Sequence, residues 1–354
     1  MKFYRNRAIY CARELGLVIS FGQFHKYGAF VMAAILGVDQ IVSRGHTRPL
    51  TEISFVEDGS KQKTLLVSSA HDKQPTIRSG ETGDWIGCFQ GHKGAVWSCK
   101  VDAATRTLCA TASGDFSAKL WCATTGNEIH DFKHKHVVKT VEFSHDSMQI
   151  ATGCQDGLIR IYDTCTPEKA PVEYKASTTD TPSTSCPVKL MWVGETEPSA
   201  LIVAKRNGRV DKWDVRQASS AGAAISVSLC ADAITVQDIE NNYAHESVSV
   251  AVDNKVILLN RSDLSTKKEY EMPKGMSFQE EGGVSLHPDG TRFIAGGSDL
   301  WLREFDCATG EVLRTFKGHH GPIRCVRYHP TGHFGASGSE DATIRIWELS
   351  KQKQ

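Results

Sequence analysis

The chain has 354 residues, and its 41 basic and 41 acidic side chains give a formal net charge of zero. This balance provides no overall field that would draw the protein onto nucleic acid or an anionic membrane, so we expect no direct contact with nucleic acid. The 11 cysteines contain no Cys-x-x-Cys pair and no regular spacing, which indicates reduced, packed thiols in a cytoplasmic or nuclear protein.

Residues 1–38 are predicted to be an extension outside the main domain. Their apolar run, AFVMAAILGV at 29–38, is shorter than the roughly 18 to 20 apolar residues that span a bilayer, so no membrane span is predicted. A short segment that docks on the domain is expected. A targeting peptide is the alternative, because Lys2, Arg5 and Arg7 precede the run.

From residue 39 to residue 354 the chain repeats one pattern seven times. An aspartate, once an asparagine, stands in a turn, and six residues later a position usually holds a large side chain that closes a β-rich run. These positions, at spacings of 41 to 51 residues, are Arg78, Trp121, Tyr162, Trp213, Leu259, Phe305 and Trp347. A Gly-His pair precedes three of the units, at Gly45-His46, Gly91-His92 and Gly318-His319. Repeats of this length and signature predict an all-β fold, a seven-bladed WD40 β-propeller.

The ends of the repeat region predict how the ring closes. The chain stops soon after the third strand of unit seven, so that sheet lacks one strand. Residues 39–43 (DQIVS) directly precede the first Gly-His pair and are expected to supply it, which removes an exposed sheet edge. Residues 164–187 are rich in Pro, Ser and Thr and are predicted to form a long mobile loop between blades three and four. Phosphorylation of its hydroxyls is an alternative to a merely solvated loop.

A hydrogen-bonded relay is expected inside three blades. The turn aspartate accepts from a histidine, the histidine reaches a hydroxyl on the second strand, and that hydroxyl reaches an aromatic side chain on the third. The residues are His92, Thr111, Asp115 and Trp121 in blade two, His134, Thr152, Asp156 and Tyr162 in blade three, and His319, Ser337, Asp341 and Trp347 in blade seven.

A catalytic site is the alternative interpretation of these residues. His92 and Asp115 with Ser113 or Thr111 would resemble a hydrolytic triad. However, the set recurs at the same positions in other blades, which is typical of a structural device rather than of a single site. His134 and His136 have no further ligand at metal-binding spacing. We therefore expect no enzymatic activity, no cofactor and no metal.

A partner protein is expected to bind at one face of the ring, near its central opening. The first strands place Thr51, Trp97, Lys139 and Arg324 there, and Lys73, Phe116 and Glu340 flank the turn aspartates. Exposed Trp, Phe and Arg side chains are typical of binding hot spots. The alternative is that Trp97 and Phe116 pack between neighbouring blades.

Several stretches go beyond a general WD repeat. They are GHTRP (45–49), TGDWIGCFQGHKGAVW (82–97), HKHVVKTVEF (134–143), QDGLIRIYD (155–163) and KGHHGPIRCVRYHPTGHFGASGSEDATIRIW (317–347). The chain thereby resembles the family of serine/threonine kinase receptor-associated proteins, also called unr-interacting proteins. The WD40 subunit of translation initiation factor 3 is the alternative. It shares the GHxGAVW and KGHxGPI patterns but lacks the HKHxVKTV and DWIG combination.

The resemblance implies a non-enzymatic adaptor, a monomer within a larger complex in the cytoplasm and nucleus. It implies a role in the SMN complex, whose Gemin-type subunits assemble the spliceosomal small nuclear ribonucleoproteins for mRNA splicing. For animal members it also implies contacts with the RNA-binding protein unr, with a role in mRNA translation, and with receptor kinases of TGF-β signalling.

Overall fold

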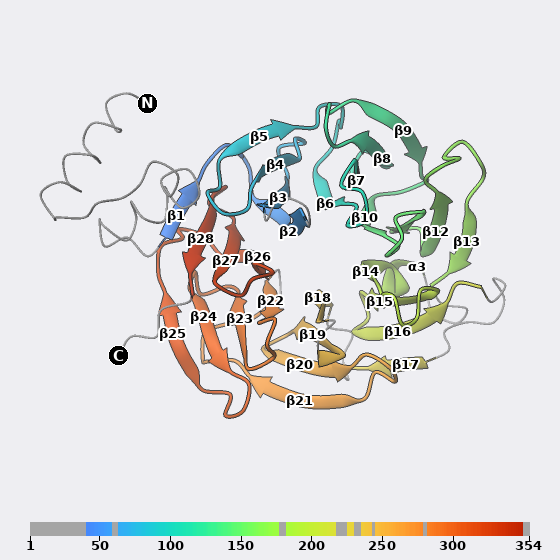
Figure 1. Cartoon of the computed structure of the whole chain (residues 1–354). Helices are drawn as coiled ribbons and strands as arrows, with labels where there is room; N and C mark the ends of the chain where they lie inside the picture. The colour runs from blue at the N-terminus through green and yellow to red at the C-terminus, as the bar shows by residue number, and fades with distance from the viewer. Residues whose placement is uncertain are drawn as a thin grey trace, which may run out of the picture.

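The computed structural model describes residues 40–58, 63–176, 182–216, 225–229, 235–242, 245–278 and 282–349. The predicted extension over residues 1–38 lies outside the described residues. Seven four-stranded antiparallel sheets surround a central opening (Figure 1), which confirms the predicted seven-bladed propeller. In blades one to six, the strands pair in chain order from the innermost strand to the outermost.

The first four blades contain 16 strands and one helical turn, α3 (Pro182–Ser185). Blade one is β2 (Leu50–Asp58), β3 (Lys63–Ala70), β4 (Thr76–Ser79) and β5 (Trp85–Cys88). Blade two is β6 (Val96–Val101), β7 (Leu108–Ser113), β8 (Ser117–Cys122) and β9 (Glu128–Lys133). Blade three is β10 (Val138–Phe143), β11 (Gln149–Cys154), β12 (Leu158–Asp163) and β13 (Val172–Lys175). Blade four is β14 (Pro187–Trp192), β15 (Ala200–Lys205), β16 (Arg209–Asp214) and β17 (Ile225–Ser228).

The last three blades complete the ring. Blade five is β18 (Val236–Asn242), β19 (Ser247–Val252), β20 (Lys255–Asn260) and β21 (Thr266–Glu271). Blade six is β22 (Gly283–Leu286), β23 (Arg292–Gly296), β24 (Leu302–Asp306) and β25 (Val312–Phe316). Blade seven combines β26 (Ile323–Tyr328), β27 (Phe334–Ser339) and β28 (Ile344–Glu348) with β1 (Gln40–Ser43) from the start of the described chain.

Strand β1 closes the ring as the sequence predicted. It pairs antiparallel with β28, and Gln40 lies opposite Trp347 in the register. Its far end bonds to blade one, because the Ser43 hydroxyl donates to the Gly83 carbonyl at 2.7 Å and accepts from Arg78 at 2.9 Å. Strand β1 therefore joins blade seven to blade one by side-chain bonds as well as by backbone pairing.

Burial follows the position of a strand within its blade. The second strands β15 and β19 are buried at every position, because neighbouring blades cover both of their faces. In the cluster between blades two and three, Leu120 joins Val141 and Ile150. Outer strands have one solvent face, and Trp85 on β5 is 60% exposed.

The predicted loop over residues 164–187 is wrong for Pro182–Ser185, which form α3, and for Pro187, which begins β14. It is also wrong for residues 172–175. These residues form β13, the outer strand of blade three, and pair with β12. Two contacts hold this strand: Glu173 accepts from Arg160 at 2.7 Å, and Tyr174 is buried with its hydroxyl donating to the Val215 carbonyl at 2.5 Å. Proline-rich composition predicted a loop, but the need to complete the sheet edge decided the structure.

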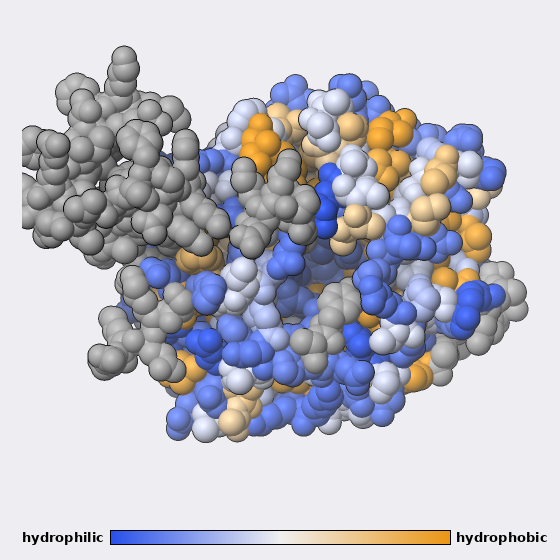
Figure 2. Space-filling model, in the orientation of Figure 1, coloured by the Kyte–Doolittle hydropathy of each residue, from blue (hydrophilic) through white to orange (hydrophobic). Residues whose placement is uncertain are grey.

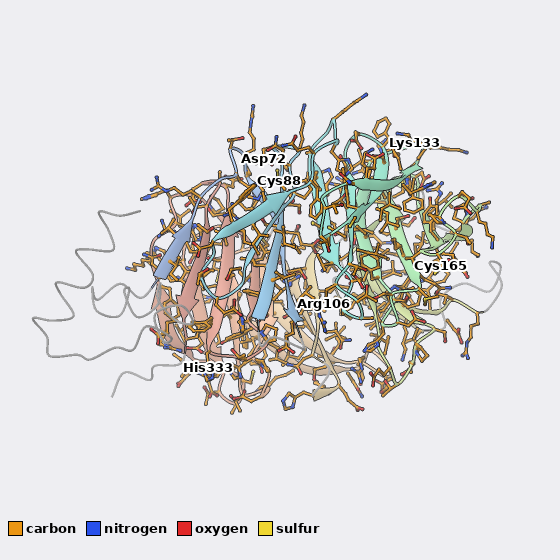
Figure 3. The ribbon with its side chains drawn as sticks, turned by 45° about the horizontal axis from the view of Figure 1, so that its top comes forward. Asp72, Cys88, Arg106, Lys133, Cys165 and His333 are labelled. Atoms are coloured by element: carbon orange, nitrogen blue, oxygen red, sulfur yellow. The ribbon has the colours of Figure 1, made fainter. Side chains whose placement is uncertain are left out.

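The two faces of the ring carry different turns. Figure 3 shows Asp72, in the turn between β3 and β4, at one face, and Arg106 and His333 toward the other. We call the face with the Asp72, Asp115 and Asp341 turns the aspartate face. Hydrophilic residues surround the hollow at the centre of the ring (Figure 2). No helix in the described part of the chain is long and apolar enough to cross a membrane.

Candidate functional site

The relay residues of blade two form a continuous hydrogen-bonded chain. His92 Nδ1 lies 2.8 Å from the Asp115 carboxylate, and His92 Nε2 lies 2.6 Å from the Thr111 hydroxyl. The indole N–H of Trp121 donates to the same hydroxyl at 2.8 Å. In the neutral imidazole, Nδ1–H donates to the carboxylate, so Nε2 accepts the Thr111 proton. The Thr111 hydroxyl thus donates one hydrogen bond and accepts another, and it is buried where a substrate cannot reach it.

Burial by itself would raise the pKa of the Asp115 carboxyl. Hydrogen bonds from His92, from the Ser117 hydroxyl and from the backbone N–H of Lys93 outweigh it and hold this pKa well below its ordinary value. The carboxylate is therefore ionised at neutral pH and acts as a fixed acceptor that anchors the turn. These contacts do not form a nucleophile with its base. They form a buried chain of hydrogen bonds that supports the turn, and we call this set of His, hydroxyl, Asp and aromatic residues a strut.

Blade seven repeats the same strut. His319 lies 2.9 Å from Asp341 and 2.7 Å from the Ser337 hydroxyl, which also accepts the Trp347 indole N–H at 2.8 Å. The hydrogen bonds of Asp341 again outweigh burial and lower its pKa to about 2. Serine here replaces threonine without changing the geometry.

In blade three the expected relay is partly wrong. His134 Nε2 does reach the Thr152 hydroxyl, at 3.0 Å, but His134 Nδ1 bonds to the Phe132 carbonyl at 2.9 Å and not to Asp156. Asp156 instead accepts from the Arg160 guanidinium at 2.8 Å, because this cation lies beside the turn. The Tyr162 hydroxyl lies 3.5 Å from His134 rather than bonding to Thr152.

The position of Arg160 also affects the pKa of His134, although burial is the larger cause. Burial and the nearby Arg160 charge lower the pKa of His134 to about 4, so it is neutral at physiological pH. In blade seven the corresponding Arg345 donates to Gln40 of the closing strand at 2.6 Å. Asp341 therefore keeps its hydrogen bond with His319.

Blade one contains a relay that the sequence reasoning missed. His46 lies 2.7 Å from Asp72 and 2.9 Å from the Ser68 hydroxyl. Ser68 continues to the Thr76 hydroxyl at 2.7 Å instead of to an indole. The Gly-His pair and the four-residue spacing from Ser68 to Asp72 were the available signals. Arg78 at the aromatic position concealed them.

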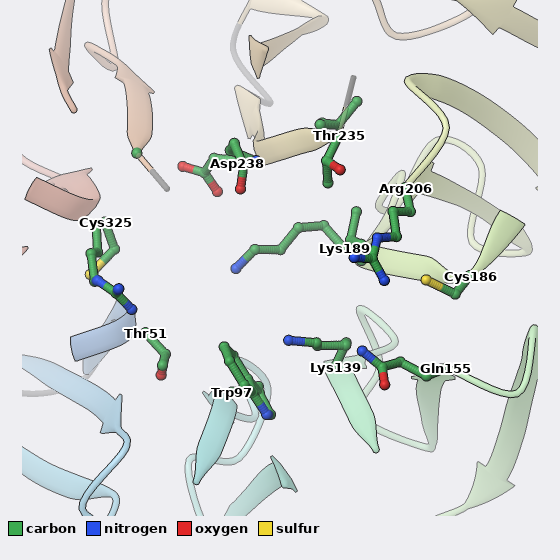
Figure 4. Close-up of a pocket in the computed structure, with 15 residues that line it drawn as sticks. Thr51, Trp97, Lys139, Gln155, Cys186, Lys189, Arg206, Thr235, Asp238 and Cys325 are labelled. Carbon is green, nitrogen blue, oxygen red and sulfur yellow. The ribbon is translucent and has the colours of Figure 1, made fainter. Parts of the chain in front are cut away.

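Four of the expected partner-binding residues meet at one cavity on the aspartate face. Thr51, Trp97, Lys139 and Arg324 line this mouth cavity, which has a volume of about 310 Å³. Figure 4 shows Lys139 extending into it beside Trp97 and Thr51. They converge because each lies near the start of an innermost strand, β2, β6, β10 or β26, and these strands line the central opening.

Trp97 is the aromatic wall of the mouth cavity. The Nζ atom of Lys139 lies 3.0 Å from the ring centroid, and the His71 ring lies edge-on at 4.9 Å. The side chain is half-buried, so it packs against residues of blades one and three and still lines the cavity. Both interpretations of Trp97, interblade packing and an accessible aromatic surface, therefore apply at once.

The other three expected residues lie in turns of the aspartate face and are not among the residues that line this cavity. Glu340 accepts from Arg324 at 2.6 Å, and Lys73 is exposed with a left-handed φ of 72°. Phe116 is 46% exposed and lies 5.6 Å from the His136 ring. An exposed phenylalanine in a left-handed turn, with φ of 67°, contributes little to the core and carries backbone strain. Phe116 therefore fits partner contact better than interblade packing.

Replacing Phe116 with glycine should not destabilise the propeller. Blades three and four already have glycine at the equivalent turn position, at Gly157 and Gly208 with φ of 79° and 76°. Relief of left-handed strain, about 1 kcal/mol, offsets the larger conformational entropy of unfolded glycine. We expect urea unfolding to give a free energy within about 0.5 kcal/mol of wild type. A loss of unfolding free energy above about 1 kcal/mol would show that the phenyl group of Phe116 is needed for folding.

Beneath the mouth cavity lies a buried network of charges that the sequence reasoning did not find. Glu52 accepts from Lys189 at 2.9 Å and from the Ser98 hydroxyl at 2.5 Å. Burial opposes its ionisation, but Lys100 and Lys189 hold its pKa well below the ordinary value. This network fixes the innermost strands to each other across the opening.

A second group in the channel centres on Arg327. Its guanidinium donates two hydrogen bonds to Asp238, at 2.5 and 2.8 Å, and its Nε lies 3.6 Å from Glu240. Burial raises the pKa of Glu240 to about 7, although the Arg327 charge opposes this shift. Arg327 is thus mainly neutralised by Asp238.

Glu240 predicts a pH dependence of stability. Its folded pKa lies above its unfolded pKa, so it favours folding at low pH and this contribution is lost as pH rises from about 4.5 to 7. Glutamine cannot ionise, so Glu240→Gln should gain on the order of 2 kcal/mol relative to wild type over that interval. Urea unfolding of both proteins at pH 5 and pH 8 measures the difference. An unchanged difference would contradict the raised pKa.

Within the described residues, no group of three or more His, Cys, Asp or Glu side chains is arranged to hold a metal ion. His134 and His136 do not converge, since His134 bonds to Phe132 and Thr152, whereas His136 Nδ1 accepts from the Val137 backbone at 2.8 Å. The mouth cavity on the aspartate face is lined by aromatic, cationic and hydroxyl groups.

Comparisons with known proteins agree with this geometry. The profile of the family "WD domain, G-beta repeat" matches residues 83–122, 126–163 and 310–348. The serine-threonine kinase receptor-associated protein of Gallus gallus is 36% identical over 309 residues, 87% of this chain and 82% of that protein. Its counterpart in Dictyostelium discoideum is 35% identical over 308 residues, 87% and 98% of the two chains. Eukaryotic translation initiation factor 3 subunit I of Caenorhabditis elegans is 26% identical over 331 residues, 87% and 95%.

Proposed function

Because the chain belongs to the family of serine-threonine kinase receptor-associated proteins, we propose that it is a non-enzymatic scaffold that holds partner proteins on its aspartate face. The observation that carries this proposal is that Trp97 and Arg324 line the mouth cavity, while Phe116 is exposed at a turn of the same face. Aromatic and arginine side chains of this kind supply much of the binding energy at protein interfaces. The His, Asp and hydroxyl groups that resemble a hydrolytic triad are engaged in the buried struts of the blades.

The partners proposed are subunits of the SMN complex, which assembles spliceosomal small nuclear ribonucleoproteins. The support is the sequence resemblance, above all the HKHVVKTV and DWIG stretches. The protein would act in the cytoplasm and the nucleus, as a monomer within the larger complex. An unr-like RNA-binding protein and receptor kinases are further proposed partners, with roles in mRNA translation and signalling.

Affinity purification of the tagged full chain, followed by mass spectrometry, tests this function. We expect SMN or Gemin-type subunits to be recovered with wild type and lost with Trp97→Ala/Phe116→Ala. The matched control is Trp85→Ala/Ile129→Ala, which removes exposed apolar side chains from the outer strands β5 and β9. This control should retain the partners and a wild-type melting temperature.

Three outcomes would contradict the proposal. Recovery of translation initiation factor 3 subunits in place of SMN-complex subunits would favour the alternative relative, subunit I, which is 26% identical. Equal loss of partners in both double variants would show that the aspartate face is not the contact surface. Retained partners in the Trp97→Ala/Phe116→Ala protein would lead to the same conclusion.

A further inference from the structure

A second cavity lies at the face opposite the aspartate face, at the far ends of the innermost strands. We call it the rear cavity. Its volume is about 450 Å³, and residues from all seven blades line it, from Phe55 on β2 to Tyr328 on β26. This volume falls within the range of ligand pockets, so the rear cavity admits one or two side chains of a segment and not a folded domain.

The charged side chains of the rear cavity are divided between two parts of the ring. The fifth residue of the innermost strand lines the cavity in six blades. From blade seven through blade one to blade five, these residues are Arg327, Ser54, Lys100, Glu142, Met191 and Glu240. The two cations therefore lie on blades seven and two. The two carboxylates lie on blades three and five, with the uncharged Met191 of blade four between them.

The carboxylate of Glu142 shares its cation with a second carboxylate. Lys100 Nζ lies 3.4 Å from Glu142 and 3.5 Å from Glu52. Burial raises the pKa of the Glu142 carboxyl, because the Lys100 charge opposes this shift without cancelling it. The Glu142 side chain is 23% exposed, so a ligand in the rear cavity can reach it.

Glu240 shares its cation in the same way. Two hydrogen bonds hold the Arg327 guanidinium to Asp238, and only Arg327 Nε approaches Glu240, at 3.6 Å. The Glu240 side chain is also 23% exposed. Residues 243 and 244, outside the described part of the chain, are tyrosine and alanine in the sequence and bring no charge. A ligand cation would therefore give Glu142 and Glu240 a partner without displacing Arg327 from Asp238.

Two groups beside these carboxylates suit a basic side chain. The Asn241 amide nitrogen donates to the carbonyls of Trp192 and Val193, at 3.4 and 3.1 Å. The Asn241 amide oxygen is buried without a hydrogen-bond partner, so an N–H group of a ligand would satisfy it. Met191 offers apolar surface between Glu142 and Glu240, which matches the methylene stem of arginine or lysine.

We infer that the rear cavity binds the side chain of an arginine or lysine on an exposed segment of a partner protein. The guanidinium or ammonium group pairs with Glu142 and Glu240, and the methylene stem packs against Met191. This inference goes beyond the proposed function, because it assigns a second contact to the face opposite the aspartate face. A nucleic acid fits less well, since its phosphates would meet the same two carboxylates.

The test uses immobilised peptide libraries with one fixed central residue and degenerate, uncharged flanks. The fixed residue is arginine or lysine, with citrulline and acetyl-lysine as uncharged counterparts of nearly the same shape. We expect the full-length protein to bind each basic library at least about tenfold better than its counterpart, with binding that weakens as salt rises. Stronger binding to arginine than to lysine would assign a guanidinium, and the reverse an ammonium.

Isosteric substitution identifies the carboxylates responsible. Glu142→Gln/Glu240→Gln should abolish the basic preference. Glu269→Gln/Glu271→Gln on the outer strand β21, with the same change in net charge at two exposed side chains, should keep it. Circular dichroism and melting temperature confirm that both variants fold.

A second pair of variants keeps every charge and fills the cavity. Ala103 and Ala104 are both exposed in the turn after β6, but of the two only Ala103 lines the rear cavity. Ala103→Trp should therefore weaken binding of the basic libraries, whereas Ala104→Trp should leave it at the wild-type level.

Four outcomes would overturn the inference. They are equal binding of the basic libraries and their uncharged counterparts, equal loss in the two glutamine variants, equal loss in the two tryptophan variants, and tighter binding of a labelled single-stranded oligouridylate than of any peptide. Free spermidine that binds as tightly as the best peptide would assign the cavity to a small amine, and it would overturn the partner segment as the occupant.

These outcomes are separate from those of the proposed function. The Trp97→Ala/Phe116→Ala protein should keep the basic preference, because its substitutions lie on the aspartate face. If partner purification depends on Trp97 and Phe116 while the libraries show no basic preference, only the rear-cavity inference fails. If the basic preference is found but no SMN-complex subunit is recovered, the rear-cavity chemistry stands and the proposed partners fail.

Discussion

Replacing Asp238 with alanine should destabilise the propeller by about 3 kcal/mol, the largest effect that we expect from a single charge. The substitution leaves the Arg327 guanidinium buried in the channel without its two hydrogen bonds. Removing one member of a buried ion pair costs far more than the pair contributes, because the remaining charge stays desolvated. Glu240, 3.6 Å from Arg327, compensates only in part, since burial favours its protonated form.

Urea unfolding followed by circular dichroism measures this loss. The matched control is Asp214→Ala, which removes the partner of Arg216 at the surface, where the arginine side chain is 75% exposed. That substitution should cost less than about 1 kcal/mol. A second comparison is Asp238→Leu/Arg327→Met, which removes both charges and should recover most of the stability. If Asp238→Ala lowered the free energy of unfolding no more than Asp214→Ala does, the charge of Arg327 would have to be neutralised by the other carboxylates.

Replacing Thr111 with valine should cost about 2 to 4 kcal/mol, although the two side chains have nearly the same shape. The hydroxyl is bonded to His92 Nε2 at 2.6 Å and accepts from the Trp121 indole at 2.8 Å. Valine leaves both buried nitrogen atoms without a partner, and each unsatisfied group costs roughly 1 to 3 kcal/mol. The prediction separates hydrogen bonding from packing, because little volume changes.

The control for this substitution is Thr315→Val on the outer strand β25, where the side chain is exposed. It should change the unfolding free energy by less than about 0.5 kcal/mol. Thr111→Val should also lose less in a Trp121→Phe background, because one of the two stranded groups is then absent. Equal effects of Thr111→Val and Thr315→Val would contradict the strut and reopen the question of what His92 and Asp115 do.

Together the two substitutions distinguish the two systems that hold the ring. The struts act within a blade and fix the turns at the aspartate face. The charge network acts between blades, since Asp238 lies on β18 and Arg327 on β26. The charge network also reaches the mouth cavity, because Asp238 is one of the residues that line it.

The repeat in the sequence was sufficient to predict the blades. Each unit contains turn residues and apolar alternation that specify four short strands, so seven copies predict a seven-bladed ring. The closing strand followed from the strand missing in unit seven. The struts of blades two and seven followed as well, because in both blades a histidine lies 18 or 19 residues before a hydroxyl that the tryptophan follows by 10 residues.

What only the tertiary structure decided are contacts between residues whose spacing carries no pattern. Asp156 turns to Arg160 instead of His134, because the closest opposite charge determines its hydrogen bond. Asp238 and Arg327 form an ion pair although they lie 89 positions apart in the sequence, and no repeat spacing relates them. The repeat spacing in the sequence predicts which residues of the same blade lie close together. The charge of the channel and of the mouth cavity depends on which side chains the ring closure brings together, and that is a property of the three-dimensional structure.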